Sequence, residues 1–361
     1  MTGAESFPAR VLAAVEAKGG PVVVGLDPRP ELLPPDLLAW GREQSADPRQ
    51  AAAAAVAAFN RRMIDAVQDI AVAVKPQLAF YEQLGWPGLR ALEETIAYAR
   101  ERGLLVIADG KRHDVGSTAE AYARAYLGGS VEPMPGGPGA GARGPGAAVG
   151  GPGAGAGAQG TGASGAGDLP WRSITSGLEA DALTVNAYMG TDSMAPFLAA
   201  CRERGKGLFV LVRTSNPSAG QLQDLPVGST QGKRPRTLAE RVAELVLAWN
   251  EGMPRAGGYG PVGAVVGATS PEELARLRAQ LPGVLFLVPG YGAQGAGARE
   301  AAAAFAADGL GALINSARDI LYAWRRERPG EPGTAEDYAR AARRAALRMR
   351  EELRAALAAR T

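Results

Sequence analysis

Apolar residues gather along the chain in short runs, and a segment with the periodicity of an amphipathic helix separates each run from the next. Eight runs have the length and composition of buried strands. They cover residues 22–26, 70–74, 104–108, 182–185, 208–212, 264–266, 284–288 and 312–314. Strands that alternate with helices in this way predict a closed parallel (β/α)8 barrel, the TIM barrel. A doubly wound open sheet is the alternative, but no G-x-G-x-x-G motif opens the first helix.

Most of these runs end in a polar residue or a glycine. The residues at the strand ends are Asp27, Lys75, Asp109, Asn186, Thr214, Ser215, Gly290 and Ser316. The carboxyl ends of all strands in a parallel barrel meet on one face, and active sites lie on that face. The pattern therefore predicts that the chemistry is located at the carboxyl end of the barrel.

Capping patterns indicate where helices begin. Residues 270–273 (Ser-Pro-Glu-Glu) combine a cap, a proline and acidic residues in the first turn, and residues 117–120 (Ser-Thr-Ala-Glu) have the spacing of a capping box. The C-terminal segment 334–360 is predicted to be a helix packed on the outside of the barrel. Its apolar stripe contains Tyr338, Ala342, Ala346, Met349, Leu353 and Leu357. A basic membrane-surface helix is less favoured, because two glutamates at 351 and 352 interrupt the positive charge.

Residues 133–167 consist almost entirely of Gly, Ala and Pro, with Arg143 as the only charged residue. Such a composition cannot form a core, and no strict G-X-Y period indicates collagen. We predict a disordered insert with a typical span of about 30 Å. It follows the third helix of the barrel and precedes the fourth strand, which places it on the face opposite the chemistry.

Composition limits the possible function classes. The 361 residues are enough for one large or two ordinary domains, and the net charge of +2 gives no basic footprint for nucleic acid. A single cysteine, Cys201, excludes an intramolecular disulfide, and no apolar run is long enough to cross a membrane. We therefore expect a soluble cytoplasmic protein. The only histidine is His113 and zinc-ligand spacing is absent, so acid–base chemistry must rest on Lys, Asp, Glu or Tyr.

The stretch 109–114, Asp-Gly-Lys-Arg-His-Asp, is the strongest candidate for chemistry. It lies between a predicted strand and a predicted helix. Alternate side chains of an extended segment share a face, so Asp109 and Lys111 can point the same way, whereas Asp114 lies where the chain turns. A solvated cluster of salt bridges is the alternative interpretation of these charges.

Asp-x-Lys-x-x-Asp after a barrel strand, continued by Val-Gly-Ser-Thr-Ala at 115–119, resembles the signature of the orotidine 5'-monophosphate decarboxylase family. The stretch 109–123 is similar to the longer bacterial branch of that family. The resemblance implies decarboxylation of orotidine 5'-monophosphate to uridine 5'-monophosphate without a metal or organic cofactor. It also implies that Lys111 donates a proton beside Asp109, and that Lys75 contacts ribose and completes a Lys–Asp–Lys–Asp array with Asp114.

Other matches to the family concern substrate binding. By resemblance Asp27 binds ribose hydroxyls and Ser215 reads the pyrimidine edge, although each is otherwise a common turn residue. The segment that follows Pro217, up to Pro235, could form a mobile lid over the pyrimidine. The glycine-rich stretch 288–295 and the end of the eighth strand have the position of a barrel phosphate site. The phosphate ligands of the family fall on Gln294 and Arg318.

The resemblance also implies a homodimer in which Asp114 and Thr118 reach the partner's active site. This sequence departs from its relatives at His113, where glycine is frequent, and at the variable Gly110. Two other functions stay open. One is a Mg²⁺-dependent sugar-phosphate decarboxylase or synthase of the same barrel type, although Lys75 stands where those enzymes generally carry glutamate. The other is a catalytically silent phosphate-binding scaffold.

Overall fold

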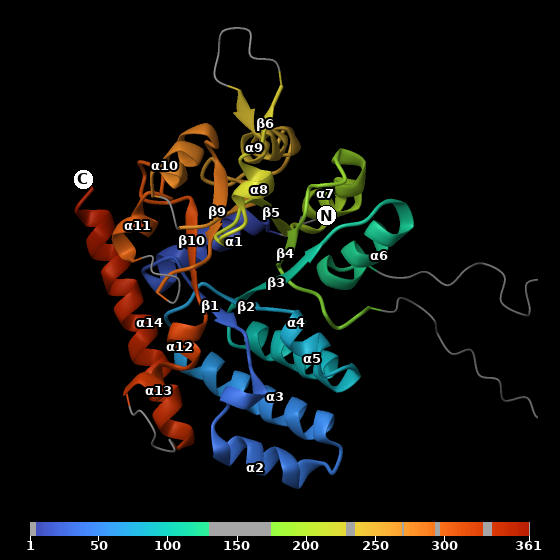
Figure 1. Ribbon diagram of the computed structural model, residues 1–361, viewed down its shortest axis with the longest axis vertical. Helices are drawn as coiled ribbons and strands as arrows, with labels where there is room; N and C mark the ends of the chain where they lie inside the picture. The colour runs from blue at the N-terminus through green and yellow to red at the C-terminus, as the bar shows by residue number, and fades with distance from the viewer. Residues whose placement is uncertain are drawn as a thin grey trace, which may run out of the picture.

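Eight parallel strands close into a barrel, and the helices surround it (Figure 1). The computed structural model describes residues 5–129, 175–228, 235–268, 271–292, 297–327 and 334–360. The strands are β1 (Val22–Leu26), β2 (Ala73–Pro76), β3 (Leu105–Arg112), β4 (Ala182–Val185), β5 (Gly207–Arg213), β8 (Gly260–Val266), β9 (Val284–Val288) and β10 (Ala312–Ser316). Their order around the barrel is β1-β10-β9-β8-β5-β4-β3-β2. Because β1 pairs with both β2 and β10, the predicted closed barrel is confirmed and the open sheet is excluded.

Several strand boundaries differ from the prediction; for example, β8 begins at Gly260 and not at residue 264. The second strand begins at Ala73, not at Ile70, because the amides of Ile70 and Ala71 donate to the carbonyl of Val67 in the turn that ends the preceding helix. The third strand continues to Arg112 and so contains the candidate motif itself. Its pairing with β4 shifts register between Ala108 and Arg112, an irregularity of the kind that often lies next to active sites.

The helices before the barrel midpoint are α1 (Phe7–Lys18), η1 (Pro30–Leu32), α2 (Pro35–Gln44), α3 (Pro48–Val67), α4 (Ala79–Glu82), α5 (Trp86–Glu101) and α6 (Gly116–Leu127). Those that follow are α7 (Thr191–Arg204), α8 (Gly220–Gln223), α9 (Leu238–Trp249), α10 (Pro271–Gln280), α11 (Ala298–Ala302), α12 (Arg318–Leu321), α13 (Ala323–Glu327) and α14 (Ala335–Ala358). Local sequence explains several starts. Asp47 accepts a hydrogen bond from the Arg49 amide before α3, and Thr237 and Glu240 form a capping box at α9.

The capping box predicted at Ser117 is wrong. Helix α6 begins at Gly116, and the preceding Val115 provides no side-chain cap. Ser117 already lies within the first turn, and the carboxylate of Asp114 instead accepts a hydrogen bond of 2.8 Å from the amide of Val115. The predicted start of α10 at Pro271 is correct, whereas its cap Ser270 lies outside the described residues.

Helix α1 closes the amino end of the barrel. Phe7 and Val11 pack into a cluster formed by inward residues of the strands. The ring of Phe7 meets that of Phe209 edge to face at 5.9 Å, and a Cβ at Gly207 would lie 2.1 Å from the Phe7 ring. Apolar side chains therefore fill the barrel interior at this end.

Helix α14 runs along the outside of the barrel beside α11, α12 and α13, at the left of Figure 1, and also packs on α3. Five residues of its predicted stripe are buried and the sixth, Leu357, is partly buried. The C-terminal helical extension is therefore confirmed as part of the barrel's outer layer. No helix among the residues that the structure describes is long and apolar enough to cross a membrane.

The predicted insert 133–167 lies outside the described residues. Its flanks are described, because α6 ends at Leu127 and β4 begins at Ala182. The end of α6 and the start of β4 both lie at the amino end of the barrel, opposite the face predicted to carry the chemistry.

Candidate active site

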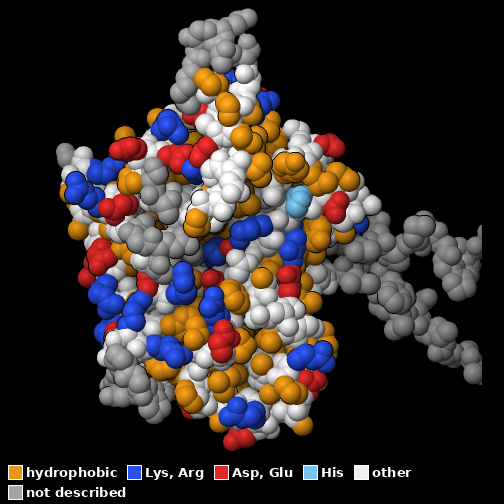
Figure 2. Space-filling view, viewed as in Figure 1, with side chains coloured by type: hydrophobic (Ala, Val, Ile, Leu, Met, Phe, Trp, Pro, Cys, Tyr) orange, Lys and Arg blue, Asp and Glu red, His pale blue; other side chains and the backbone are white. Residues whose placement is uncertain are grey.

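A cavity of about 460 Å³ opens at the carboxyl end of the barrel. Figure 2 shows basic and acidic side chains side by side in a hollow near the centre of the face in view. The cavity is lined by Asp27, Lys75, Gln77, Asp109, Lys111, Thr184, Leu211, Thr214, Ser215, Asn216, Val265, Leu287, Pro289, Gly290, Tyr291, Asn315, Ala317 and Arg318.

The alternation of side chains along each strand determines which of these residues face the cavity. Ala73, Ile107, Ala182 and Leu313 belong to the apolar cluster inside the barrel. Side chains two residues further along a strand point to the same face, so the next inward positions are Lys75, Asp109, Thr184 and Asn315. All four of these line the cavity. These four residues, which we call the polar layer of the site, therefore lie next to the apolar side chains that fill the barrel interior.

Asp109 is the centre of the polar layer. One carboxylate oxygen lies 2.5 Å from Lys75 Nζ and the other lies 2.6 Å from Lys111 Nζ. The hydroxyl of Thr184 donates to the carboxylate at 2.9 Å, and the amide of Gln77 donates at 3.0 Å. Lys75 and Asp109 are only 5% and 7% exposed, so their charges are shielded from bulk water.

These neighbours determine the ionisation of the buried pair. Burial alone raises the pKa of Asp109, but the ammonium groups of Lys75 and Lys111 outweigh it and hold that pKa well below its usual range. Burial lowers the pKa of Lys75, but the carboxylates of Asp109 and Asp27 outweigh it, so the net shift is upward. Both groups therefore stay charged at neutral pH.

Lys111 is held in an unusual backbone conformation. Its φ of 48° makes it the only residue other than glycine with a positive φ among those the structure describes. Its amide donates to the Thr184 hydroxyl at 2.9 Å, which fixes this conformation. Its side chain remains half exposed and reaches into the cavity. A strained residue held by surrounding contacts is common at functional sites.

Two buried oxygens of the site have no hydrogen-bond partner among the described residues. They are Asp27 Oδ1 and Asn315 Oδ1, and both residues line the cavity. Buried polar atoms in proteins are usually satisfied, so these two acceptors suit a ligand that brings donors. Burial, as the largest cause, raises the pKa of Asp27, with a further upward contribution from Asp109.

Arg318 and Gly290 mark the side of the cavity predicted to bind phosphate. The Arg318 side chain is exposed at the cavity and makes no ion pair with the residues that the structure covers. Gly290 has a φ of 99°, which favours glycine. Gln294 lies outside the described residues, so its predicted role stays a prediction.

Asp114 and Thr118 are not part of the cavity. Asp114 is partly exposed and bonded within its own loop, and Thr118 is exposed in the first turn of α6. His113 is exposed in the same loop, as expected for an ordinary loop histidine. The structure thus brings together Asp27, Lys75, Asp109, Lys111, Ser215 and Arg318, and leaves Asp114 and Thr118 outside this chain's own cavity.

Sequence reasoning gave no role to Gln77, Thr184, Asn216 or Asn315, all of which line the cavity. The two-residue period of the strands carried a signal for Thr184 and Asn315, because each is a polar residue two positions after an inward apolar one. In the described part of the chain, no group of three or more His, Cys, Asp or Glu side chains could hold a metal ion.

A closed parallel barrel whose carboxyl end holds a Lys–Asp–Lys array, with Lys75 and Asp109 buried, has the architecture of a TIM-barrel enzyme. Residues 20–131 and 171–328 match the model of the orotidine 5'-phosphate decarboxylase / HUMPS family, and the chain belongs to that family. The match omits residues 132–170, which contain the predicted insert.

Individual relatives agree with this assignment. The chain is 43% identical to an orotidine 5'-phosphate decarboxylase of Rhodopirellula baltica over 97% of this chain and 99% of the relative. It is 40% identical to one of Deinococcus radiodurans over 86% of this chain and 90% of the relative. The structure of Leishmania donovani OMP decarboxylase superposes with a TM-score of 0.63 at 30% identity, and the superposition covers 98% of both chains.

The raised pKa of Asp27 predicts a pH-dependent cost to stability. Between the ordinary value of 3.8 and the raised value, the folded protein binds a proton that the unfolded chain does not bind. The contribution of Asp27 to the free energy of unfolding therefore falls as pH rises from 3.8 to the raised pKa, and it stays low at higher pH.

We expect Asp27→Asn to increase the free energy of unfolding at pH 7, and this gain to shrink as pH falls towards 4. Urea denaturation at several pH values measures both, with Glu101→Gln on α5 as the exposed control. A gain that is the same at pH 4 and pH 8 would contradict this assignment.

Proposed function

We propose that this protein decarboxylates orotidine 5'-monophosphate to uridine 5'-monophosphate, the last step of de novo UMP biosynthesis, without a metal or organic cofactor. The observation that carries the proposal is the array in which Asp109 lies between two lysine ammonium groups inside the cavity. Family membership and the names of the relatives support the same reaction.

In the proposed reaction the bond from pyrimidine C6 to its carboxylate breaks, and the electron pair stays on C6 as CO₂ leaves. The Lys111 ammonium beside C6 stabilises this pair and then donates a proton to it. The uncharged amine recovers a proton from water through the open side of the cavity. Lys111 suits this role because its side chain is half exposed to the cavity while its backbone is fixed by Thr184.

Asp109 and Lys75 are assigned to preorganisation. The Asp109 carboxylate holds the Lys111 ammonium in place before the substrate binds, so little reorganisation is needed as charge develops. Asp109 also lies on the side of the substrate carboxylate, whose repulsion is relieved when CO₂ departs. Lys75 compensates the charge of Asp109 and is positioned to contact the ribose.

The remaining cavity residues are assigned to substrate binding. Asp27 accepts from the ribose hydroxyls through its unpartnered oxygen, and Ser215 contacts the pyrimidine. Arg318 binds the phosphate together with Gln294. Binding energy from the phosphate, which does not react, can then be used to stabilise the transition state at C6.

The buried ammonium of Lys75 argues against the Mg²⁺-dependent alternative. It lies 2.5 Å from Asp109, so a positive charge already occupies one of the oxygens that would otherwise coordinate the cation. A silent scaffold has no use for a strained lysine held against a buried carboxylate. Decarboxylation of the nucleotide therefore fits the array better than either alternative.

We further propose that the protein works as a cytoplasmic homodimer with shared active sites. Three of the exposed large hydrophobic side chains follow strands at the carboxyl end of the barrel: Val115 after β3, and Tyr188 and Met189 after β4. The loops that carry them are joined, because the Asn186 amide donates to the Arg112 carbonyl. An exposed apolar surface around Asp114 suits a second copy of the chain. A small nucleotide, rather than nucleic acid, is the expected ligand.

The activity is tested by following the absorbance of orotidine 5'-monophosphate in the presence of EDTA. We expect the wild-type protein to consume it at an unchanged rate with the chelator. Lys111→Ala should lose at least about a hundredfold in kcat, the scale of one electrostatic group in the transition state. Circular dichroism would verify that the variant is folded. Loss of wild-type activity with EDTA, or retention of a tenth of kcat in the variant, would contradict the proposed mechanism.

The shared site is tested by complementation between two inactive variants. Lys111→Ala and Asp114→Ala should each damage both sites of their homodimers. In a mixed dimer, one site collects both lesions and the other has neither, so activity should rise to about half of the wild-type level per heterodimer.

A mixture of Lys111→Ala with Asp109→Ala is the matched control, because both residues serve their own barrel and no intact site can form. If verified heterodimers of Lys111→Ala and Asp114→Ala are no more active than their parents, Asp114 acts within its own subunit.

A further inference from the structure

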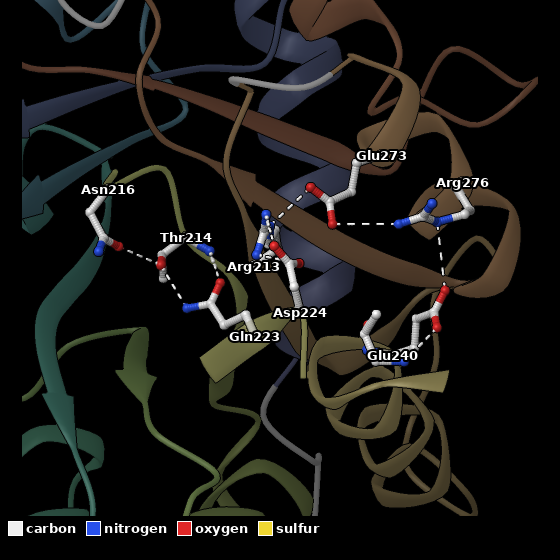
Figure 3. Close-up of polar contacts among 9 residues, drawn as sticks. Arg213, Thr214, Asn216, Gln223, Asp224, Glu240, Glu273 and Arg276 are labelled. Atoms are coloured by element: carbon white, nitrogen blue, oxygen red, sulfur yellow. Dashed lines mark hydrogen bonds and ion pairs between the residues drawn. The ribbon is translucent and has the colours of Figure 1, made fainter. Parts of the chain in front are cut away.

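The segment 214–216 after β5 faces the cavity and is tied to helix α8 by a pair of neighbouring contacts. Figure 3 shows Arg213 and Thr214 opposite Asp224 and Gln223. Arg213 forms an ion pair with Asp224 at 2.9 Å, and its Nε donates to Glu273 of α10 at 2.9 Å. The last residue of β5 therefore connects α8 to the body of the barrel.

Gln223 makes a two-point contact with Thr214. The Thr214 backbone amide donates to Gln223 Oε1 at 2.9 Å, and Gln223 Nε2 donates to the Thr214 hydroxyl at 2.8 Å. A backbone amide can only donate, so this contact fixes which end of the Gln223 side chain carries the oxygen. The other end must then be the donor to the hydroxyl.

The direction of these hydrogen bonds also determines the orientation of the Asn216 side-chain amide. Because the Thr214 hydroxyl accepts from Gln223, its own proton is free to donate. It donates to Asn216 Oδ1, which lies 2.6 Å from the Thr214 hydroxyl oxygen (Figure 3). This bond occupies the oxygen of the Asn216 amide. Asn216 lines the cavity, and no hydrogen bond to a described residue engages its NH₂ group, so this group can donate to a ligand.

The place of β5 in the barrel indicates which part of a ligand meets this donor. Around the barrel, β5 lies two strands from β3, which carries Lys111, and three strands from β10, which precedes Arg318. On the β1 and β2 side, the cavity is lined by Asp27 and Lys75, which are assigned to the ribose, whereas Ser215 lines it after β5. A nucleotide with its phosphate at Arg318 and its reacting carbon at Lys111 is therefore expected to turn the far edge of its pyrimidine ring towards β5. The ring presents carbonyl oxygens, which accept hydrogen bonds from an NH₂ group.

We propose that Asn216 is a pyrimidine-binding residue and that Gln223 is the positioning residue that, through Thr214, turns the Asn216 amide so that its NH₂ group faces the ligand. This inference rests on the proposed function for the identity of the ligand. The three side chains of Gln223, Thr214 and Asn216 thus form a relay, a chain of hydrogen bonds that favours a ligand with a hydrogen-bond acceptor on its pyrimidine.

Two variants distinguish an effect through the relay from a general loss of stability in the loop. Gln223→Glu keeps an acceptor for the Thr214 amide but cannot donate to the hydroxyl, which then donates to the carboxylate and releases Asn216. Asn216→Ala removes the donor itself. Gln221→Ala is the matched control, because Gln221 is an exposed glutamine on the same short helix.

The measurement is calorimetric titration of each protein with uridine 5'-monophosphate and with ribose 5-phosphate, which lacks the pyrimidine. We expect Gln223→Glu and Asn216→Ala each to raise the Kd for the nucleotide about tenfold, the scale of one lost hydrogen bond. The Kd for ribose 5-phosphate should stay within about twofold, and Gln221→Ala should match wild type for both. The KM for orotidine 5'-monophosphate should rise more than kcat falls, as expected for lost uniform binding.

The double variant tests whether the two residues act through one relay. Once Asn216 is absent, adding Gln223→Glu should cause little further loss of nucleotide binding. Equal weakening of both ligands, additive losses, or unchanged nucleotide binding would each overturn the inference. These outcomes are distinct from failure of the proposed function, in which the wild-type protein would bind the nucleotide but leave orotidine 5'-monophosphate intact.

Discussion

The contact of Asp109 with two lysine ammonium groups is the interaction on which the active site depends. Lys75 and Asp109 are almost fully buried, so each would carry a large desolvation cost without the other. Lys111 could take many positions in solvent, but it is fixed by Asp109 and by a backbone bond to Thr184. The array is therefore in place before any ligand arrives, which is the condition for electrostatic catalysis without reorganisation.

The barrel supplies that array with a rigid base and with separate binding regions. Apolar side chains from the strands and from α1 fill the interior below the polar layer, which keeps water from reaching the buried pair from the amino end. Above the layer, the side proposed to bind phosphate lies at β9 and β10, and the segment held by Gln223 lies at β5. In the proposed mechanism the proton donor Lys111 and the proposed phosphate and pyrimidine ligands thus come from different strands, so the loops can specify the ligand while the array stays unchanged.

The sequence predicted the barrel and most of the charged site because both depend on local, periodic signals. Apolar runs located all eight strands, and polar residues at their ends located Asp27, Lys75, Asp109 and Lys111. Boundaries were wrong where local hydrogen bonds override the pattern: the Ile70 amide donates to the Val67 carbonyl in the turn after α3, and Ser117 lies inside α6. The contact between Gln223 and Thr214 could not be predicted, because it joins a strand end to a four-residue helix through side chains that have no periodic signature.

The most direct test of this account is a double-mutant cycle on the buried pair, measured as the free energy of unfolding in urea at pH 7. Asp109→Asn leaves the buried Lys75 ammonium without its ion-pair partner, and Lys75→Met leaves the buried Asp109 carboxylate with only the half-exposed Lys111 as a cation, so each should cost about 3–5 kcal/mol. Together they should cost less than the sum by at least about 1 kcal/mol, because the second change removes the group that the first left unpaired. Lys18→Met on α1, combined with Asp109→Asn, is the control and should be additive. Additive losses for Lys75 and Asp109 as well would contradict the claim that this pair holds the site together.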